Sequence, residues 1–86
     1  MTFSKEGSKY ISRLTATDEP LTVQVIRTVK GYFTVYAAID GLTPVSIFCQ
    51  TERKDLIFQL DVPAGIEVTL ESETEVTDAK TLQSGI

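Results

Sequence analysis

The sequence predicts an all-β protein, a single antiparallel β-sandwich or small barrel of about six or seven strands. Apolar residues make up 42% of the chain, and in most segments they recur at every second position, the period of a half-buried strand. They are chiefly Val, Ile, Leu, Phe and Tyr, which favour a pleated surface. Turn residues separate these runs, and 86 residues leave room for one core.

The predicted organisation is an N-terminal arm over residues 1–8, a β-sandwich or barrel domain over 9–77 and a C-terminal tail over 78–86. The first strand is expected from Lys9 to Ala16. Asp18-Glu19-Pro20 should end it in a turn, because proline lacks an N–H and biases the residue before it to an extended conformation.

The next two segments show the clearest alternation. Leu21, Val23, Val25, Arg27 and Val29 share one face of the second segment, and Phe33, Val35, Ala37 and Ile39 share one face of the third. Lys30-Gly31 stands between the two segments, and glycine permits the positive φ of a tight turn. We therefore predict that the two strands form a β-hairpin.

Asp40-Gly41 marks another turn and suits type I′ geometry. Pro44 should begin the following strand, where a missing donor is tolerated. In that strand Val45, Ile47 and Cys49 share a face, which we predict to be the core face. A core cysteine behaves as a small apolar residue, and its burial disfavours the reactive thiolate.

The last third of the chain continues the alternation. A charged loop spans Thr51 to Asp55, and a strand follows in which Leu56, Phe58 and Leu60 share a face. After a turn over Asp61 to Gly65, a strand begins at Ile66 and its alternation could continue to Val76. The segment from Thr77 to Ile86 is polar, and we interpret it as a tail or a short edge strand.

The composition argues against several functions. There is no histidine, which removes the commonest general base and metal ligand. The glycines do not form a phosphate-binding loop, and the net charge of −4 disfavours nucleic-acid binding. There is no signal-peptide-like or membrane-spanning apolar run. We predict a non-enzymatic protein without cofactor, metal or small-molecule substrate.

Acidic residues are dense near the end of the chain. Glu67, Glu71, Glu73 and Glu75 have the same parity, and Asp78 follows. Three interpretations are open: a solvent-facing strand, a ribbon that contacts a basic partner protein, or a weak calcium site. Calcium requires six to eight converging oxygens, whereas side chains along one strand are about 6.6–6.8 Å apart per two residues and do not converge.

Two other groups of residues are candidates for partner contact. Ile26, Tyr32, Tyr36 and Ala38 would form a second, semi-apolar face, which a loop, the N-terminal segment or a partner must cover. Basic residues gather near the N-terminus, as Lys5, Lys9 and Arg13, and on a loop tip, as Arg53 and Lys54. These charges could match acidic residues on a second copy arranged head to tail, or they could be ordinary solubilising charges.

Length, β content, acidic balance and absence of catalytic residues together resemble the small all-β structural proteins of tailed-phage virions, of the capsid-decoration or tail and neck type. The resemblance is one of type and assigns no residue a role. It implies a structural subunit that contacts copies of itself or a larger shell or tail, in a virion, after synthesis in the host cytoplasm. The alternative hypothesis is a small acidic binding protein or inhibitor that blocks a basic host or partner protein.

Overall fold

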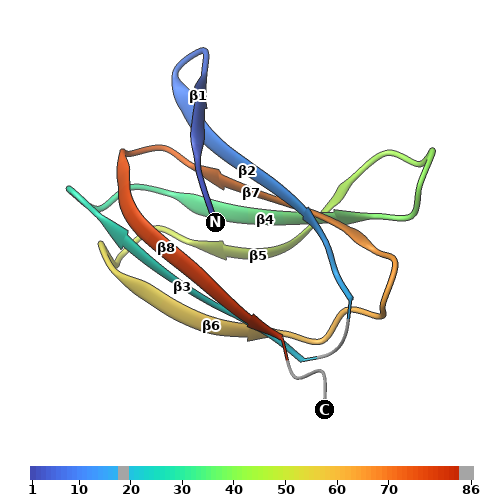
Figure 1. Cartoon of the computed structure of the whole chain (residues 1–86). Coiled ribbons are helices and arrows are strands. Elements are labelled where there is room, and N and C mark those ends of the chain that lie inside the picture. Colours follow the sequence, from blue (N-terminus) through green and yellow to red (C-terminus); the bar gives the residue numbers. More distant parts are fainter. Residues whose placement is uncertain (18–19, 84–86) are drawn as a thin grey trace.

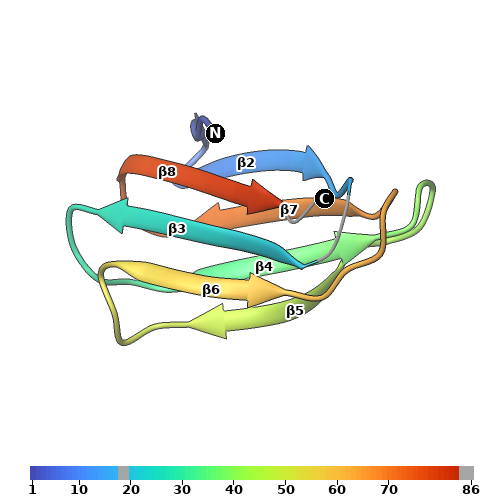
Figure 2. The same ribbon diagram turned by 60° about the horizontal axis from the view of Figure 1, so that its bottom comes forward.

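The computed structural model describes residues 1–17 and 20–83, and these ranges contain eight strands. The strands are β1 (Ser4–Glu6), β2 (Lys9–Thr15), β3 (Leu21–Arg27), β4 (Phe33–Ala38), β5 (Val45–Gln50), β6 (Leu56–Leu60), β7 (Glu67–Ser72) and β8 (Val76–Gln83). They form a five-stranded antiparallel sheet, β1-β2-β7-β4-β5, and a three-stranded antiparallel sheet, β6-β3-β8. The two sheets lie face to face as the layers of a sandwich (Figures 1 and 2). The predicted all-β sandwich is confirmed, with eight described strands instead of six or seven.

The core fills the space between the two sheets. Apolar side chains at alternate positions of β3, β4 and β7 point inward and are almost fully buried: Leu21, Val23, Val25, Phe33, Val35, Val68 and Leu70. Aromatic rings join the layers, because Phe58 of β6 stacks on Phe48 of β5 with ring centroids 4.4 Å apart and meets the Phe33 ring edge-on at 5.8 Å. The period-two pattern therefore located the inner faces of these strands.

Both ends of the chain contribute strands. The predicted N-terminal arm contains β1, which pairs with β2 around Gly7 at φ +66° and projects from the body of the molecule (Figure 1). The predicted tail over 78–86 is wrong as far as Gln83, because β8 pairs with β3 from Val76 to that residue. As far as Gln83 the segment forms an edge strand, as the other interpretation held, but β8 has eight residues and is therefore not short. The predicted turn at Asp18-Glu19 and the last three residues lie outside the described ranges.

The predicted hairpin around Lys30-Gly31 is wrong. β3 belongs to the three-stranded sheet and β4 to the five-stranded sheet, so the chain crosses from one layer to the other between them. The reason is that both strands bury their apolar faces against each other across the core. Strand β3 ends at Arg27, and Val29 in the crossing segment is exposed.

Cys49 is exposed, so its predicted place in the core is also wrong. The pairing of β4 with β5 contains a bulge: Val35 lies opposite Phe48 and Tyr36 opposite Ser46, which leaves Ile47 as the extra residue. The bulge reverses the parity of the strand. Phe48 therefore points into the core, and Cys49 points to the outer face, where it accepts a hydrogen bond from the Thr34 hydroxyl with Oγ1 3.7 Å from Sγ.

β4 and β5 form the hairpin that spans the predicted turn at Asp40-Gly41. The amide of Leu42 donates to the carbonyl of Ile39 at 2.9 Å, and Gly41 has φ +87°. Asp40 has no positive φ, so the expected type I′ geometry is wrong, and a positive φ at the second central residue alone is the type II arrangement. Pro44 immediately precedes β5, so the strand begins one residue later than predicted, at Val45.

The part of the chain that the structure describes has no helix, and thus none that is long and apolar enough to span a membrane.

Candidate protein-docking surface

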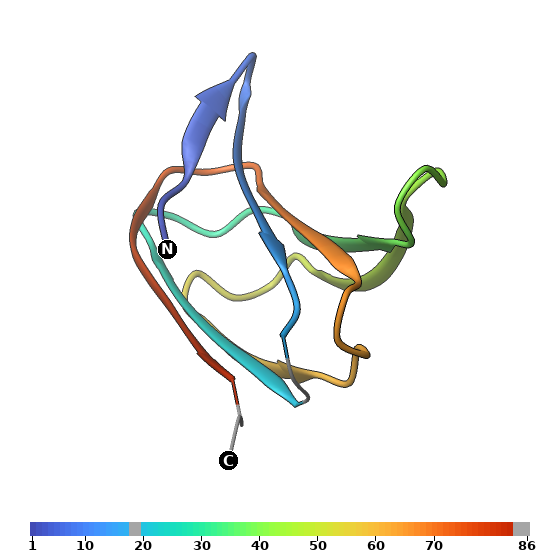
Figure 3. The ribbon, with the colours of Figure 1, turned by 45° about the vertical axis from the view of Figure 1, so that its right-hand side comes forward.

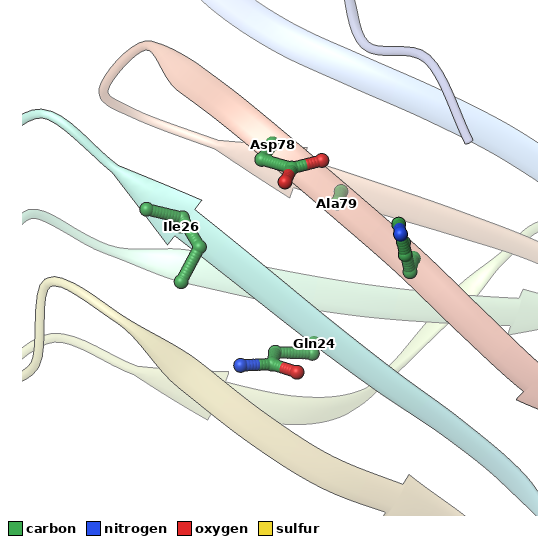
Figure 4. Close-up of a pocket in the computed structure, with 5 residues that line it drawn as sticks. Gln24, Ile26, Asp78 and Ala79 are labelled. Atoms are coloured by element: carbon green, nitrogen blue, oxygen red, sulfur yellow. The ribbon is translucent and has the colours of Figure 1, made fainter.

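The outer face of the three-stranded sheet has an open hollow (Figure 4). Gln24 and Ile26 of β3 line it together with Asp78, Ala79 and Lys80 of β8. Asp78 and Lys80 have opposite charges, so the lining of the hollow does not favour a ligand of either charge. In residues 1–17 and 20–83, no three carboxylate or thiol side chains gather closely enough to hold a metal ion.

The residues of the predicted semi-apolar face are on different surfaces. Ile26 lies on the outer side of the three-stranded sheet, paired with Asp78. Tyr36 and Ala38 lie on the outer side of the five-stranded sheet, where Tyr36 contributes to a shallow hollow beside Ile11 and Pro44. The four residues therefore form no common face, because β3 and β4 belong to different layers.

Tyr32 is covered from within the molecule. The Lys9 ammonium lies 4.9 Å from the centre of the Tyr32 ring, and the Tyr32 amide donates to Oε1 of Glu73 at 3.1 Å. Lys9 is also 3.5 Å from a carboxylate oxygen of Glu71, and Arg13 forms a bidentate pair with Glu6. The N-terminal segment thus provides part of the cover, and two of its basic residues already have acidic partners in the same chain.

The acidic residues form no continuous ribbon. Glu67 and Glu71 lie on the outer face of β7, a central strand of its sheet, but the alternation stops at Ser72. The Ser72 hydroxyl donates to the Thr74 carbonyl at 2.6 Å and accepts from the Thr74 amide at 3.2 Å, which turns the chain toward β8. Glu73 and Glu75 lie in that turn, so the predicted single acidic face is wrong.

Arg27 is the polar residue that the sequence interpretation overlooked. Its side chain is buried, with the residue 1% exposed, and all its N–H groups point to acceptors. Nε donates to Lys54 O, Nη1 to Tyr32 O and Ser72 Oγ, and Nη2 to Gly31 O and Arg53 O. Burial lowers the pKa of the guanidinium, while the nearby Asp55 and Glu73 carboxylates raise it. A charged residue at a core-facing position of a strand was the signal for this buried site.

Arg27 explains the position of the loop that contains Arg53 and Lys54. The main-chain carbonyls of these two residues accept hydrogen bonds from the guanidinium, so the loop over 51–55 is tied to the end of β3. The Arg53 and Lys54 side chains are left on the surface, and Lys54 pairs with Asp55 at 3.4 Å. Arg27 is thus a structural residue that closes one end of the sandwich.

The opposite end of the sandwich exposes apolar side chains. Ile39, Leu42 and Val45 are 61%, 64% and 62% exposed, and with Ala37, Ala38, Thr43 and Ile66 they line an open, mostly apolar hollow. The β4–β5 hairpin extends past the three-stranded sheet (Figures 1 and 3), so its inner face there has no opposing layer. We call Ile39, Leu42, Val45 and Ile66 the hairpin patch.

The sequence contained a signal for the hairpin patch. Turns are usually polar, yet Ile39 and Leu42 flank the Asp40-Gly41 turn directly. The sequence interpretation placed Ile39 and Val45 on core faces, which is consistent with their parity. It could not show that the other sheet is too small to cover them.

A second exposed feature adjoins the hairpin patch. β5 and β6 are edge strands of their sheets and run along the same margin of the sandwich (Figure 2). Neither strand contains a charged residue. Ile47 of β5 and Ile57 of β6 are 42% and 70% exposed. Uncharged edge strands with exposed apolar side chains are open to contact with another chain.

Comparison of the chain with family models, with curated proteins and with solved structures found no match.

Proposed function

We propose that the chain is a non-enzymatic assembly protein that docks onto another protein through the hairpin patch. The exposure of Ile39, Leu42 and Val45 on one projecting hairpin carries this proposal. Full burial of such a side chain contributes about 1.5–3 kcal/mol. Burial of these side chains against a partner would therefore stabilise the complex, whereas in the isolated chain they stay in contact with water.

The chemistry of the patch supports a protein partner. The cores of protein interfaces are apolar and poor in charge, with a polar rim. The patch fits this description, because no charged residue lines the hollow, Thr43 is the one polar side chain in its lining, and Asp40 follows Ile39 directly in the turn. A hairpin held at its base by two strand pairings, β4 with β7 and β4 with β5, can present these side chains without reordering.

The resemblance of type to small virion proteins supports a capsid, neck or tail assembly as the setting. The absence of histidine from the chain and the lack of converging polar groups on the described surfaces favour contact over catalysis. The alternative, an inhibitor that acts through acidic residues, receives no such support. Its proposed contact residues are divided between a central strand and a turn.

The test substitutes one of two exposed leucines at a time in the organism or virus that makes the chain, and it compares the sizes of the complexes that contain each variant. Leu42 lies in the hairpin patch, and Leu82 of β8 is 72% exposed at the opposite margin. We expect the wild-type chain to elute from a size-exclusion column in a complex far larger than 9.5 kDa. Leu42→Asp should move it to the free fraction, and Leu82→Asp should leave it in the complex. Elution of the wild type as free chain, or equal behaviour of the two variants, would contradict the proposal.

A further inference from the structure

The edges of the two sheets differ in their protection. An edge strand offers unpaired N–H and C=O groups to other chains, and proteins guard such edges with charges, bulges or short strands. β1 is three residues long and contains Lys5 and Glu6, and β8 contains Asp78 and Lys80. β5 and β6 contain no charge. The margin that these two strands form is therefore the open margin of the described chain.

The residues next to each strand distinguish β5 from β6. Asp55 and Asp61 stand directly before and after β6. In an antiparallel pair of two β6 strands, Asp55 of one copy would lie beside Asp61 of the other, and like charges placed opposite each other are destabilising. β5 is preceded by Pro44 and followed by Thr51, so it meets no such repulsion.

The exposed side chains of β5 also favour a partner. Val45 and Ile47 are exposed apolar residues, and Val45 belongs to the hairpin patch. The bulge at Ile47 is a protective device of the edge, but no charged side chain accompanies it. The strand thus has unpaired backbone groups along its edge and two exposed apolar side chains, Val45 and Ile47.

The charges at the two ends of β5 favour a second copy of the chain as the occupant. Asp40 lies in the hairpin before β5, and Arg53 lies in the loop after it. Antiparallel pairing of two β5 strands places the loop of each copy at the hairpin of the other, so Arg53 approaches Asp40 twice. Glu52 and Asp55 balance Arg53 and Lys54, so the loop brings no net negative charge to Asp40.

We infer that β5 pairs antiparallel with β5 of a second copy, which joins the two five-stranded sheets into one continuous sheet across a two-fold axis. A strand edge that meets its own copy in a closed dimer must be antiparallel, because the contact uses the same surface twice. The inference deepens the proposed function and rests on it: the dimer presents two hairpin patches, one at each end of the joined strands, to a larger partner.

Sedimentation equilibrium of the purified chain tests the inference. We expect the mass to rise from 9.5 kDa toward twice that value with concentration. Ile47→Lys and Ser46→Lys each place two like charges in the interface between the two β5 strands. Each should therefore raise the dimer dissociation constant about tenfold or more. Leu82→Lys, the matched change on β8, should not alter it. Thermal melts followed by circular dichroism identify any variant that fails to fold. If one of the two β5 variants fails to fold, the other still tests the inference.

The single cysteine supplies an independent measurement, because a spin label attaches only at Cys49. β5 has six residues, and strands rise about 3.4 Å per residue, so two labels on joined β5 strands lie within about 20 Å. A dimer through β8 would place them farther apart, because β5 and β8 belong to different sheets and lie at opposite margins of the sandwich (Figure 2).

The outcomes separate the two proposals. A chain that is monomeric at every concentration, a dimer that both lysine variants leave intact, or labels well beyond about 20 Å apart would overturn β5 pairing. Loss of the large complex in Leu42→Asp would uphold docking in each of these cases. A β5 dimer that joins no larger complex would uphold the inference and overturn the proposed function.

Discussion

The two ends of the sandwich are built in opposite ways. At one end the loops over 28–32 and 51–55 and the turn after β7 converge on the buried side chain of Arg27, whose N–H groups all have acceptors. At the other end the β4–β5 hairpin extends past the opposing sheet and leaves Ile39, Leu42 and Val45 exposed. We therefore expect the first end to stabilise the isolated chain and the second end to be the one that a partner covers.

The largest effect is expected at the Arg27 end. Arg27→Leu removes the donors of five hydrogen bonds and leaves carbonyl groups without partners, which should lower the free energy of unfolding by about 3–5 kcal/mol. Small domains have only about 5–15 kcal/mol of stability in total. Urea denaturation followed by circular dichroism measures the change.

Two control variants accompany Arg27→Leu. Arg27→Lys keeps the charge but offers three donors on one nitrogen, so most of the loss should persist. Arg13→Leu removes an exposed arginine that pairs with Glu6, and it should leave the urea midpoint nearly unchanged. Equal shifts of the urea midpoint for Arg27→Leu and Arg13→Leu would contradict the stabilising role assigned to the buried Arg27 side chain.

Ser72→Ala should have an intermediate effect at the same end. The Ser72 hydroxyl accepts from Arg27 and holds the turn to Thr74, and the residue is fully buried. Its removal leaves one guanidinium N–H without an acceptor and should cost about 2 kcal/mol in the same urea assay. Ser46→Ala on the exposed edge strand serves as the control and should cost less than about 0.5 kcal/mol. An unchanged midpoint for Ser72→Ala would show that water replaces the hydroxyl.

The smallest effect on stability is expected at the hairpin patch. Leu42→Ser removes an apolar side chain that is mostly in water already, so the free energy of unfolding should change by less than about 0.5 kcal/mol. Thermal and urea unfolding of the purified chain measure it. A loss above about 1.5 kcal/mol would mean that Leu42 stabilises the chain itself.

Period-two alternation was enough to locate most of the strands, because each strand buries one face. β2, predicted from Lys9 to Ala16, ends one residue earlier, at Thr15. Strand β1 was missed because three residues, two of them charged, show no alternation. Which strands are neighbours could not be predicted, because an inward face looks the same whether the next strand joins the same sheet or the opposite one. The wrong hairpin at Lys30-Gly31 follows from this ambiguity.

The candidate surface was less predictable than the fold. The bulge at Ile47 reverses parity without a proline or glycine to mark it, so Cys49 and Phe48 were assigned to the wrong faces. The hairpin patch depends on the unequal sizes of the two sheets, which no local pattern encodes. Ile26, Tyr32 and Tyr36 were grouped because their strands were thought to be neighbours.

The bonds of Arg27 also determine how this end of the molecule opens. Its acceptors are 4 to 45 residues away along the chain, on three separate segments. If one segment leaves, the guanidinium is exposed to water and its bonds to the other two weaken. We therefore expect the loops at this end to open together as one cooperative unit, and we expect a protease that needs a single mobile loop to cleave slowly there.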